Sequence, residues 1–160
     1  MIDLGIQTIS VSYSQLVVFD HSLDRPFNGW TDRHVAQGFA WRPGSVAFRT
    51  VEEGGQHLVA VTFEVTEDDA VAPNALRVID VPFEVPPDEM IEIGSVSDSA
   101  SFKIPAGLYG LRFECFERSG GDTPLIRLSF RRSSSPGFRV IRAGPDFSPE
   151  APLVLTASPA

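Results

Sequence analysis

The chain has few of the residues from which disulfides and thiolate sites are built. It contains one cysteine, Cys115, in 160 residues. A single thiol excludes an internal disulfide and any cluster of thiolate ligands. Cys115 stands between Glu114 and Phe116 in an apolar stretch with no base or cluster of cations beside it. We therefore expect a buried structural thiol rather than a reactive one.

Long apolar runs and a signal-like start are also missing. No run approaches the roughly 18 apolar residues that a membrane-spanning helix needs. The first residues, Met1-Ile2-Asp3-Leu4, are not a basic region followed by a long apolar core and a small-residue cleavage site. We therefore expect a reduced, soluble, cytoplasmic protein without membrane insertion.

Residue patterns that carry catalysis or bind metals are absent as well. His21, His34 and His57 are scattered, and none has the i, i+4 spacing that would place two imidazoles on one metal. Asp20-His21-Ser22 has the residue types of a hydrolase triad, but neighbours at a strand end point apart. No nucleophile elbow, Walker loop or dinucleotide fingerprint follows an expected strand. We expect no catalytic residues, no metal and no cofactor, and hence not an enzyme.

Clustered carboxylates leave one chemical alternative open. Glu67, Asp68 and Asp69 stand together in an expected loop and could supply oxygens to a calcium ion. The D-x-D-x-D-G spacing is not present, which favours a solvated loop over a calcium site. Glycosidase chemistry needs two carboxyl groups at a set separation, which a sequence does not give.

The abundant residues predict a mostly β protein. The chain has twelve phenylalanines and thirteen each of glycine and proline, which suits short strands joined by tight turns. We predict an antiparallel two-layer β-sandwich of about eight to ten strands with one short helix near residues 31–37, and a β-barrel as the alternative. Residues 1–142 are expected to form this domain. The Pro-rich segment 143–160 is expected to add a last edge strand or to be partly mobile.

Alternating apolar residues mark the expected strands. The clearest is 58–65, where Val59, Val61 and Phe63 fall on one face. The unbroken apolar run 16–19 predicts that a strand over 11–19 begins half buried and ends fully buried. In strand 108–117, Tyr109 follows a Pro-x-Gly turn and is expected to bond a nearby backbone group at a corner of the sandwich. The other expected strands are 45–51, 76–85, 90–93, 102–104, 125–132, 138–141 and 153–155.

The expected helix has suitable residues at both ends. Thr31 is a favourable N-cap, Asp32 places a negative charge in the first turn, and Gly38 suits the left-handed position after the last turn. With Thr31 as the cap, Trp30 and Val35 have the spacing of a hydrophobic staple. We therefore expect Trp30 to pack inward, with a partner-facing position as the alternative.

The net charge of −8 is unevenly spread along the chain. Residues 1–100 contain sixteen Asp or Glu against five Lys or Arg, giving −11, and residues 101–160 contain five against eight, giving +3. The acidic first part repels nucleic acid phosphates, so we expect no direct nucleic acid binding unless the Arg-rich end forms a separate face. An acidic surface would suit the partner of a DNA-binding protein, although acidity also serves solubility alone.

Two blocks of the sequence are arranged as in a known family. The first comprises Val11-Ser12-Tyr13-Ser14-Gln15, Val18-Phe19, Trp30-Thr31-Asp32, Gly38-Phe39-Ala40, Gly44, Val46 and Phe48. The second comprises Val81-Pro82-Phe83-Glu84-Val85, Ile91-Glu92-Ile93, Ser101 to Leu111 and Cys115. In this order they resemble the competence protein J family of bacterial nuclease inhibitors from Ile9 to Cys115, and the chain departs from the pattern beyond Phe116.

The resemblance implies a binding function. Members of this family are small soluble inhibitors that bind and restrain a membrane-associated DNA-entry nuclease during competence. A nuclease is therefore the implied protein partner, and carboxylates standing in for phosphates would block its DNA-binding cleft. The alternative is a small-ligand or carbohydrate-binding β-sandwich, in which Trp30 and Trp41 would face solvent and stack on sugar rings.

The candidate partner-binding residues are acidic residues at expected turns in the acidic part of the chain, together with one aromatic residue. They are Trp30, Asp32, Glu52, Glu53, Glu67, Asp68 and Asp69.

Overall fold

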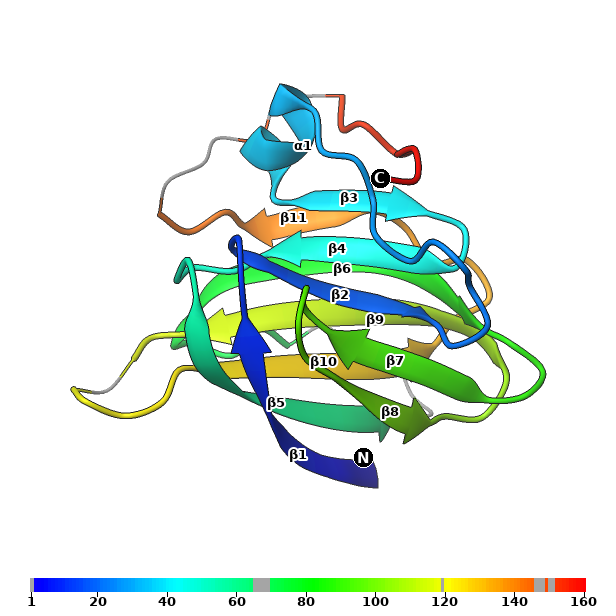
Figure 1. The fold of residues 1–160 in the computed structure, drawn as a ribbon, viewed down its shortest axis with the longest axis horizontal. Helices are drawn as coiled ribbons and strands as arrows, with labels where there is room; N and C mark the ends of the chain where they lie inside the picture. Colours follow the sequence, from blue (N-terminus) through cyan, green and yellow to red (C-terminus); the bar gives the residue numbers. More distant parts are fainter. Residues whose placement is uncertain (1, 65–69, 119, 146–148, 150–151) are drawn as a thin grey trace.

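Two β-sheets packed face to face make up the molecule (Figure 1). The computed structural model describes residues 2–64, 70–118, 120–145, 149 and 152–160. One sheet has six strands in the order β1-β5-β10-β9-β6-β11, and the other has five in the order β3-β4-β2-β7-β8. The predicted mostly β, two-layer sandwich with one short helix is confirmed.

The bounds of the elements follow the chain. The six-stranded sheet contains β1 (Ile2–Val11), β5 (Gly55–Glu64), β6 (Ala75–Val85), β9 (Gly107–Phe116), β10 (Leu125–Arg132) and β11 (Arg139–Arg142). The five-stranded sheet contains β2 (Gln15–Asp20), β3 (Phe39–Arg42), β4 (Ser45–Arg49), β7 (Met90–Gly94) and β8 (Ser99–Lys103). The helix α1 covers Asp32–Gln37.

One strand pair departs from the expected antiparallel pattern. Strand β10 pairs with β5 in parallel, with Leu125 opposite Leu58 and Phe130 opposite Phe63. The antiparallel hairpin of β9 and β10 lies between β5 and β6, although β5 and β6 follow one another in the chain. Strands β5 and β6 therefore point in the same direction.

Aromatic side chains fill the space between the sheets. Phe48 of β4 stacks on Phe113 of β9 with ring centroids 4.5 Å apart, which joins the two layers. Tyr109 and Phe83 each meet Phe130 edge to face, at 5.9 Å and 6.0 Å. All five of these side chains are buried. Burial at this scale is the main stabilising contribution to such a fold.

Two polar predictions about the core are confirmed. The hydroxyl of Tyr109 donates to the carbonyl oxygen of Pro105 at 2.7 Å, which is the expected corner bond. The thiol of Cys115 is buried, and desolvation raises its pKa to about 12. A thiol held in its neutral form is not a nucleophile at neutral pH.

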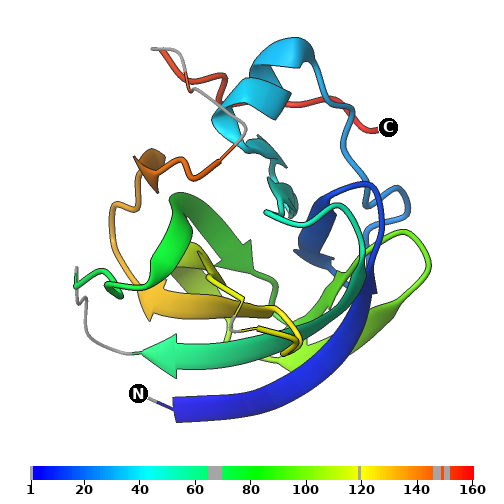
Figure 2. The same ribbon diagram turned by 90° about the vertical axis from the view of Figure 1, so that its left-hand side faces the viewer.

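Strand β2 is buried on both faces, as its unbroken apolar run predicts. Leu16 and Val18 belong to the main core. Val17 and Phe19 point the other way and form a second cluster with Ala47. Phe27 and Trp30 pack against that cluster, so the segment between β2 and α1 covers the outer face of the five-stranded sheet. Figure 2 shows α1 beyond the edge strand β3.

Three strand predictions need correction. Strand β1 was not expected, because its alternation is weak and most of its side chains are exposed. The predicted strand 11–19 is broken by a turn at Tyr13 and Ser14, so that β1 ends at Val11 and β2 begins at Gln15. Residues 153–155 form no strand in the described part of the chain.

The ends of α1 are those predicted. Thr31 is the N-cap, and its Oγ1 accepts a hydrogen bond from the backbone N–H of His34 at 3.3 Å. His34 returns the bond, since its Nδ1 accepts from the backbone N–H of Thr31 at 3.0 Å. His34 Nε2 therefore carries the proton and donates to the carbonyl oxygen of Thr156 at 2.9 Å. Gly38 ends the helix in the left-handed conformation with φ of 88°.

The C-terminal segment 152–160 lies along α1 and the loop before it. The side-chain amide of Gln37 donates to the carbonyl oxygen of Val154 at 2.9 Å and accepts from the N–H of Val154 at 2.8 Å. Asn28 and Pro159 form an isolated β-bridge. An amide side chain thus satisfies backbone groups that have no strand partner here.

Ion pairs cross the outer face of the six-stranded sheet. The guanidinium of Arg112, which is only 1% exposed, binds both carboxylate oxygens of Asp80 at 2.7 Å and 2.9 Å. Arg139 also reaches Asp80, at 3.1 Å. Burial alone would raise the pKa of Asp80, but the hydrogen bonds and charges of Arg112 and Arg139 outweigh it and lower that pKa.

We predict that Asp80→Asn lowers the free energy of unfolding by about 2 kcal/mol, because it leaves the buried Arg112 without its bidentate partner. A carboxyl group with a lowered pKa stabilises the fold above its unfolded pKa, here 3.8, and this contribution is lost as the pH falls through the folded value. Urea unfolding at pH 7 and at pH 3 measures both effects. The difference between the variant and the parent protein should shrink at the lower pH.

The exposed Asp24 supplies the matched control. Asp24→Asn removes the same charge and should leave stability within about 0.5 kcal/mol of the parent. Equal stability of the two variants at neutral pH would show that the Asp80 pairs contribute nothing.

Candidate functional site

The turn between β1 and β2 has a strained backbone. Tyr13 and Ser14 both have positive φ, 57° and 55°. Ser12 and Gln15 face each other across the turn as an isolated bridge. Such turns favour Asn-Gly, because a residue with a Cβ pays roughly 1–2 kcal/mol in the left-handed region. The ring of Tyr13 is 79% exposed, so no burial of its own compensates for this strain.

Neighbouring loops hold the turn in place. The N–H of Ser14 donates to the carbonyl oxygen of Glu53 at 2.8 Å, and the N–H of Thr50 donates to the carbonyl oxygen of Ser14 at 2.8 Å. The buried hydroxyl of Ser95 accepts from the N–H of Ser12 at 2.9 Å. It also donates toward the carbonyl oxygen of Gln15 at 2.9 Å. The protein therefore holds an exposed tyrosine in a fixed position at the cost of local strain.

Two hollows adjoin this turn and share Tyr13, Ser14 and Arg49. One, of about 320 Å³, is also lined by Trp30 and Val35. The other, of about 490 Å³, extends to Glu53 and to the buried Arg77. We call the accessible part of this region the Tyr13 surface. It comprises Tyr13, Ser14, Trp30, Val35, Arg49 and Glu53.

Trp30 lies at one side of the Tyr13 surface and serves two roles. Its ring packs against the cluster of Val17, Phe19 and Ala47, which agrees with the expected inward position. Its indole N–H points to the side chain of Gln15 at 3.3 Å. Because the same residue lines the hollow beside Tyr13, part of the ring remains open to a partner.

Two of the predicted site residues lie beside the Tyr13 turn, Trp30 in one hollow and Glu53 in the other. Glu52 instead lines a different hollow, where its carboxylate binds Arg118 at 2.8 Å and 3.1 Å. Asp32 is exposed in the first turn of α1 and lines none of the hollows at Tyr13. Glu67, Asp68 and Asp69 lie outside the described residues.

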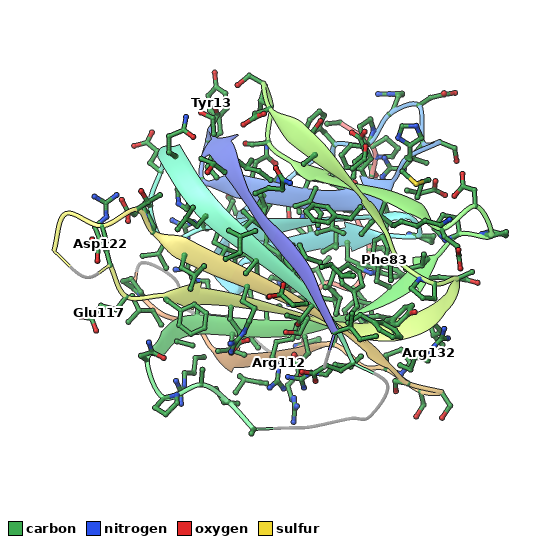
Figure 3. The ribbon with its side chains drawn as sticks, turned by 90° about the horizontal axis from the view of Figure 1, so that it is seen from below. Tyr13, Phe83, Arg112, Glu117, Asp122 and Arg132 are labelled. Carbon is green, nitrogen blue, oxygen red and sulfur yellow. The ribbon has the colours of Figure 1, made fainter. Side chains whose placement is uncertain are left out.

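Exposed acidic side chains occur at this end of the sandwich, and the hollows at Tyr13 are lined by Arg49 and Arg77 as well as by Glu53. Figure 3 shows Glu117 and Asp122 at the same end as Tyr13, and Arg132 at the opposite end. Glu53, Glu117 and Asp122 are all exposed. A cationic partner surface would therefore meet Glu53 together with Arg49 at the Tyr13 turn, and Glu117 and Asp122 elsewhere at this end.

Tyr13 is the site residue that sequence reasoning missed. The alternation of Val11, Tyr13 and Gln15 indicates a strand, and neither residue of the turn is a glycine or an asparagine. The one available signal was the pair of serines, Ser12 and Ser14, which commonly occur in turns between apolar segments.

Neither a metal-binding cluster nor a membrane-spanning helix occurs in the described part of the chain. No group of three or more His, Cys, Asp or Glu side chains placed to hold a metal occurs among those residues. No described helix is long and apolar enough to cross a membrane.

Comparison with known proteins gives the family. The model of competence protein J, ComJ, matches residues 8–131. The chain belongs to the competence protein J family. The match runs past Cys115 and through most of β10. We expected the sequence to depart from the family beyond Phe116, and this prediction is wrong for the residues up to Arg131.

A curated relative from Bacillus subtilis (strain 168) is named DNA-entry nuclease inhibitor. It is 31% identical over 106 residues, which cover 66% of this chain and 76% of the relative.

Two solved structures share the fold. One, described as ComJ, inhibitor of the DNA degrading activity of NucA, from Bacillus subtilis, has a TM-score of 0.68 at 23% identity and covers 82% of this chain and 97% of that chain. The other, crocagin biosynthetic gene J, has a TM-score of 0.50 at 14% identity and covers 78% of this chain and 97% of that chain. The sandwich is therefore common to ComJ and to a protein from a biosynthetic context.

We predict that Tyr13→Gly stabilises this ComJ family member by about 0.5–1 kcal/mol. Glycine adopts positive φ without steric cost, while its greater freedom in the unfolded chain offsets part of the gain. Tyr13→Ala is the matched control, because alanine loses the ring but keeps a Cβ in the left-handed conformation. Urea unfolding should give the glycine variant the higher midpoint at an unchanged slope. If its midpoint is no higher than that of the alanine variant, the backbone at residue 13 is not strained.

Proposed function

We propose that this chain is a non-enzymatic protein that binds and inhibits a nuclease. The observation that carries the proposal is membership of the competence protein J family together with the curated relative named DNA-entry nuclease inhibitor. Family members with a common fold and about one third identity often keep one binding role. We also propose that the protein is located in the reducing cytoplasm, as the single cysteine leads us to expect.

We place the centre of the contact at the Tyr13 surface. Tyrosine, tryptophan and arginine are the residues most often found at the energetic centre of protein interfaces, and this surface has Tyr13, Trp30 and Arg49 beside one another. The turn is fixed by hydrogen bonds from two separate segments, the loop between β4 and β5 and Ser95 after β7. A preformed contact loses little conformational entropy on binding.

The acidic residues at the Tyr13 end of the sandwich supply the electrostatic part of the mechanism. A nuclease presents a cationic cleft to DNA, so the exposed Glu53, Glu117 and Asp122 would speed the encounter and orient it. The bound inhibitor would then occlude the cleft. Asp32 and the sequence-predicted Glu67, Asp68 and Asp69 remain candidate contacts at the periphery.

The carbohydrate-binding alternative has less support. It needs open tryptophan rings, but the indole N–H of Trp41 donates to the carbonyl oxygen of Pro82 at 2.7 Å. The ring of Trp41 also meets Phe138 edge to face at 5.1 Å. Trp41 is thus committed to the interior contact between β3 and the segment before β11.

The test is a DNA degradation assay with a NucA-type nuclease from the organism that encodes this chain. Addition of the purified protein in excess should abolish degradation, and the two proteins should elute together in size-exclusion chromatography. Full degradation at every inhibitor concentration, with the proteins eluting separately, would contradict the proposal.

The location of the contact is tested by Tyr13→Ala. We expect it to weaken binding by about 2 kcal/mol, or roughly thirtyfold in Kd, because a central aromatic side chain is lost. The control is Leu108→Ala, which removes a side chain of 39% exposure at the start of β9. Isothermal titration calorimetry of each variant against the nuclease gives both values. Equal affinity of the Tyr13 variant and the parent would show that the contact lies elsewhere on the protein. It would not contradict the proposal that the protein inhibits a nuclease.

A further inference from the structure

A third hollow, of about 260 Å³, lies at the Tyr13 end of the sandwich. Val51, in the loop between β4 and β5, lines both this hollow and the one that contains Glu53. Glu117, which Figure 3 shows at the same end as Tyr13, also borders it. We call this hollow the His57 pocket. Its wall includes His57, Leu76, Cys115, Phe116, Leu125 and Ile126.

His57 brings a polar ring into this pocket. The residue is only 2% exposed, and it lies on the same face of β5 as Val59 and Val61, which belong to the core. Its Nδ1 is 2.9 Å from the carbonyl oxygen of Gly55. Because a carbonyl oxygen only accepts, Nδ1 carries the proton, and Nε2 of the neutral ring is an acceptor. Within the described chain, the bond to Gly55 is the one hydrogen bond of this ring, so Nε2 has no partner there.

The unpaired Nε2 can be reached from outside. Among the described residues, the side-chain polar atoms that are both sealed from solvent and without a partner are Glu114 Oε2 and Arg131 Nε. Nε2 of His57 is not one of them, so it keeps some accessible surface, and the hollow that His57 lines is the way to it. A nearly buried acceptor without a partner costs free energy, and a donor that enters the pocket would satisfy it.

The other residues at the pocket are apolar, neutral or already paired. Desolvation raises the pKa of the Cys115 thiol to about 12, so this wall residue carries no charge at neutral pH. Glu52 and Arg118, which also line the pocket, bind each other at 2.8 Å. Glu117 is exposed to solvent. A ligand that fits is therefore uncharged, apolar over most of its surface, and able to donate one hydrogen bond.

We propose that the His57 pocket binds a phenol group, whose hydroxyl donates to Nε2 of His57 while its ring packs on the apolar wall. A phenol combines a flat apolar ring with one hydroxyl donor, and contact with the ring of Phe116 favours an aromatic body over an aliphatic one. The phenol belongs either to a small compound or to a tyrosine side chain of a protein partner. This site goes beyond nuclease inhibition and does not depend on it.

The binding test is an NMR titration of the labelled protein at neutral pH with p-cresol, which is the tyrosine side chain as a free molecule, and with toluene. p-Cresol should shift the amide signals of residues 57, 115 and 116 in a saturable manner. Toluene lacks the hydroxyl and leaves Nε2 unpaired, so it should bind at least about tenfold more weakly. Equal affinity for the two compounds, or no saturable shift with p-cresol, would overturn the proposal.

Two histidine variants locate the acceptor. His57→Phe keeps a flat ring in the core and removes Nε2, so it should weaken p-cresol binding by about tenfold and leave toluene binding unchanged. His21→Phe is the matched control, because it removes an imidazole whose side chain is 52% exposed and which does not line the pocket. It should bind p-cresol like the parent. Equal losses in the two variants would refute His57 as the acceptor.

A second measurement covers the case in which His57→Phe does not fold. The chain has three histidines, so His21→Gln leaves His34 and His57. In the structure His34 carries its ring proton on Nε2 and His57 carries it on Nδ1, and nitrogen–proton correlation spectra of the imidazoles distinguish these two tautomers. p-Cresol should shift the Nε2 signal of the ring protonated at Nδ1 in a saturable manner. A fixed Nε2 signal, while amide signals of the pocket saturate, would exclude the hydrogen bond.

A NucA-type nuclease that elutes together with the protein distinguishes the two sources of the phenol. Competitive displacement of p-cresol by the nuclease would assign the pocket to a tyrosine side chain of that partner. Unchanged p-cresol binding in the complex would assign it to a small phenolic compound. The titration with p-cresol alone needs no nuclease, so a failure of the proposed nuclease inhibition would leave its result unaffected.

Discussion

The position of one hairpin determines most of the remaining structure. Strands β9 and β10 lie between β5 and β6, and they form the centre of the six-stranded sheet. Their inward side chains, among them Tyr109, Phe113 and Phe130, supply the layer against which the five-stranded sheet packs. A sheet with these two strands removed would lose its aromatic core and would separate β5 from β6, so burial of this hairpin is the constraint on which the sandwich depends.

The fold also places basic residues of the second part of the sequence next to acidic residues of the first part. Along the sequence the first hundred residues are acidic and the rest are basic, but the arginines of the second part come to lie beside carboxylates of the first. Arg112 pairs with Asp80, and Arg118 pairs with Glu52. Charges of the two parts are therefore paired in places across neighbouring strands, but the net charge of −8 remains. Exposed acidic side chains at the Tyr13 end include Glu53, Glu117 and Asp122.

Local features of the fold could be predicted from the sequence, and non-local features could not. The caps of α1 at Thr31 and Gly38 and the corner bond of Tyr109 depend on a few neighbouring residues, and all three were predicted. The parallel pairing of β5 with β10 depends on segments more than sixty residues apart, for which no short pattern exists. The site divides in the same way. Trp30 and Glu53 were predicted candidates, and each lines one of the two hollows at the Tyr13 turn. Tyr13 itself was missed, because its left-handed conformation is held by Glu53, Thr50 and Ser95 from other parts of the chain.

The central claim is that a nuclease contacts this ComJ family member at the Tyr13 end of the sandwich. Hydrogen–deuterium exchange of the protein, free and bound to its NucA-type nuclease, tests that claim most directly. We predict slower exchange of the amides in 12–15 and 50–55 on complex formation, with no change along β10 and β11. Protection confined to the outer face of the six-stranded sheet, with the Tyr13 turn exchanging as in the free protein, would contradict it.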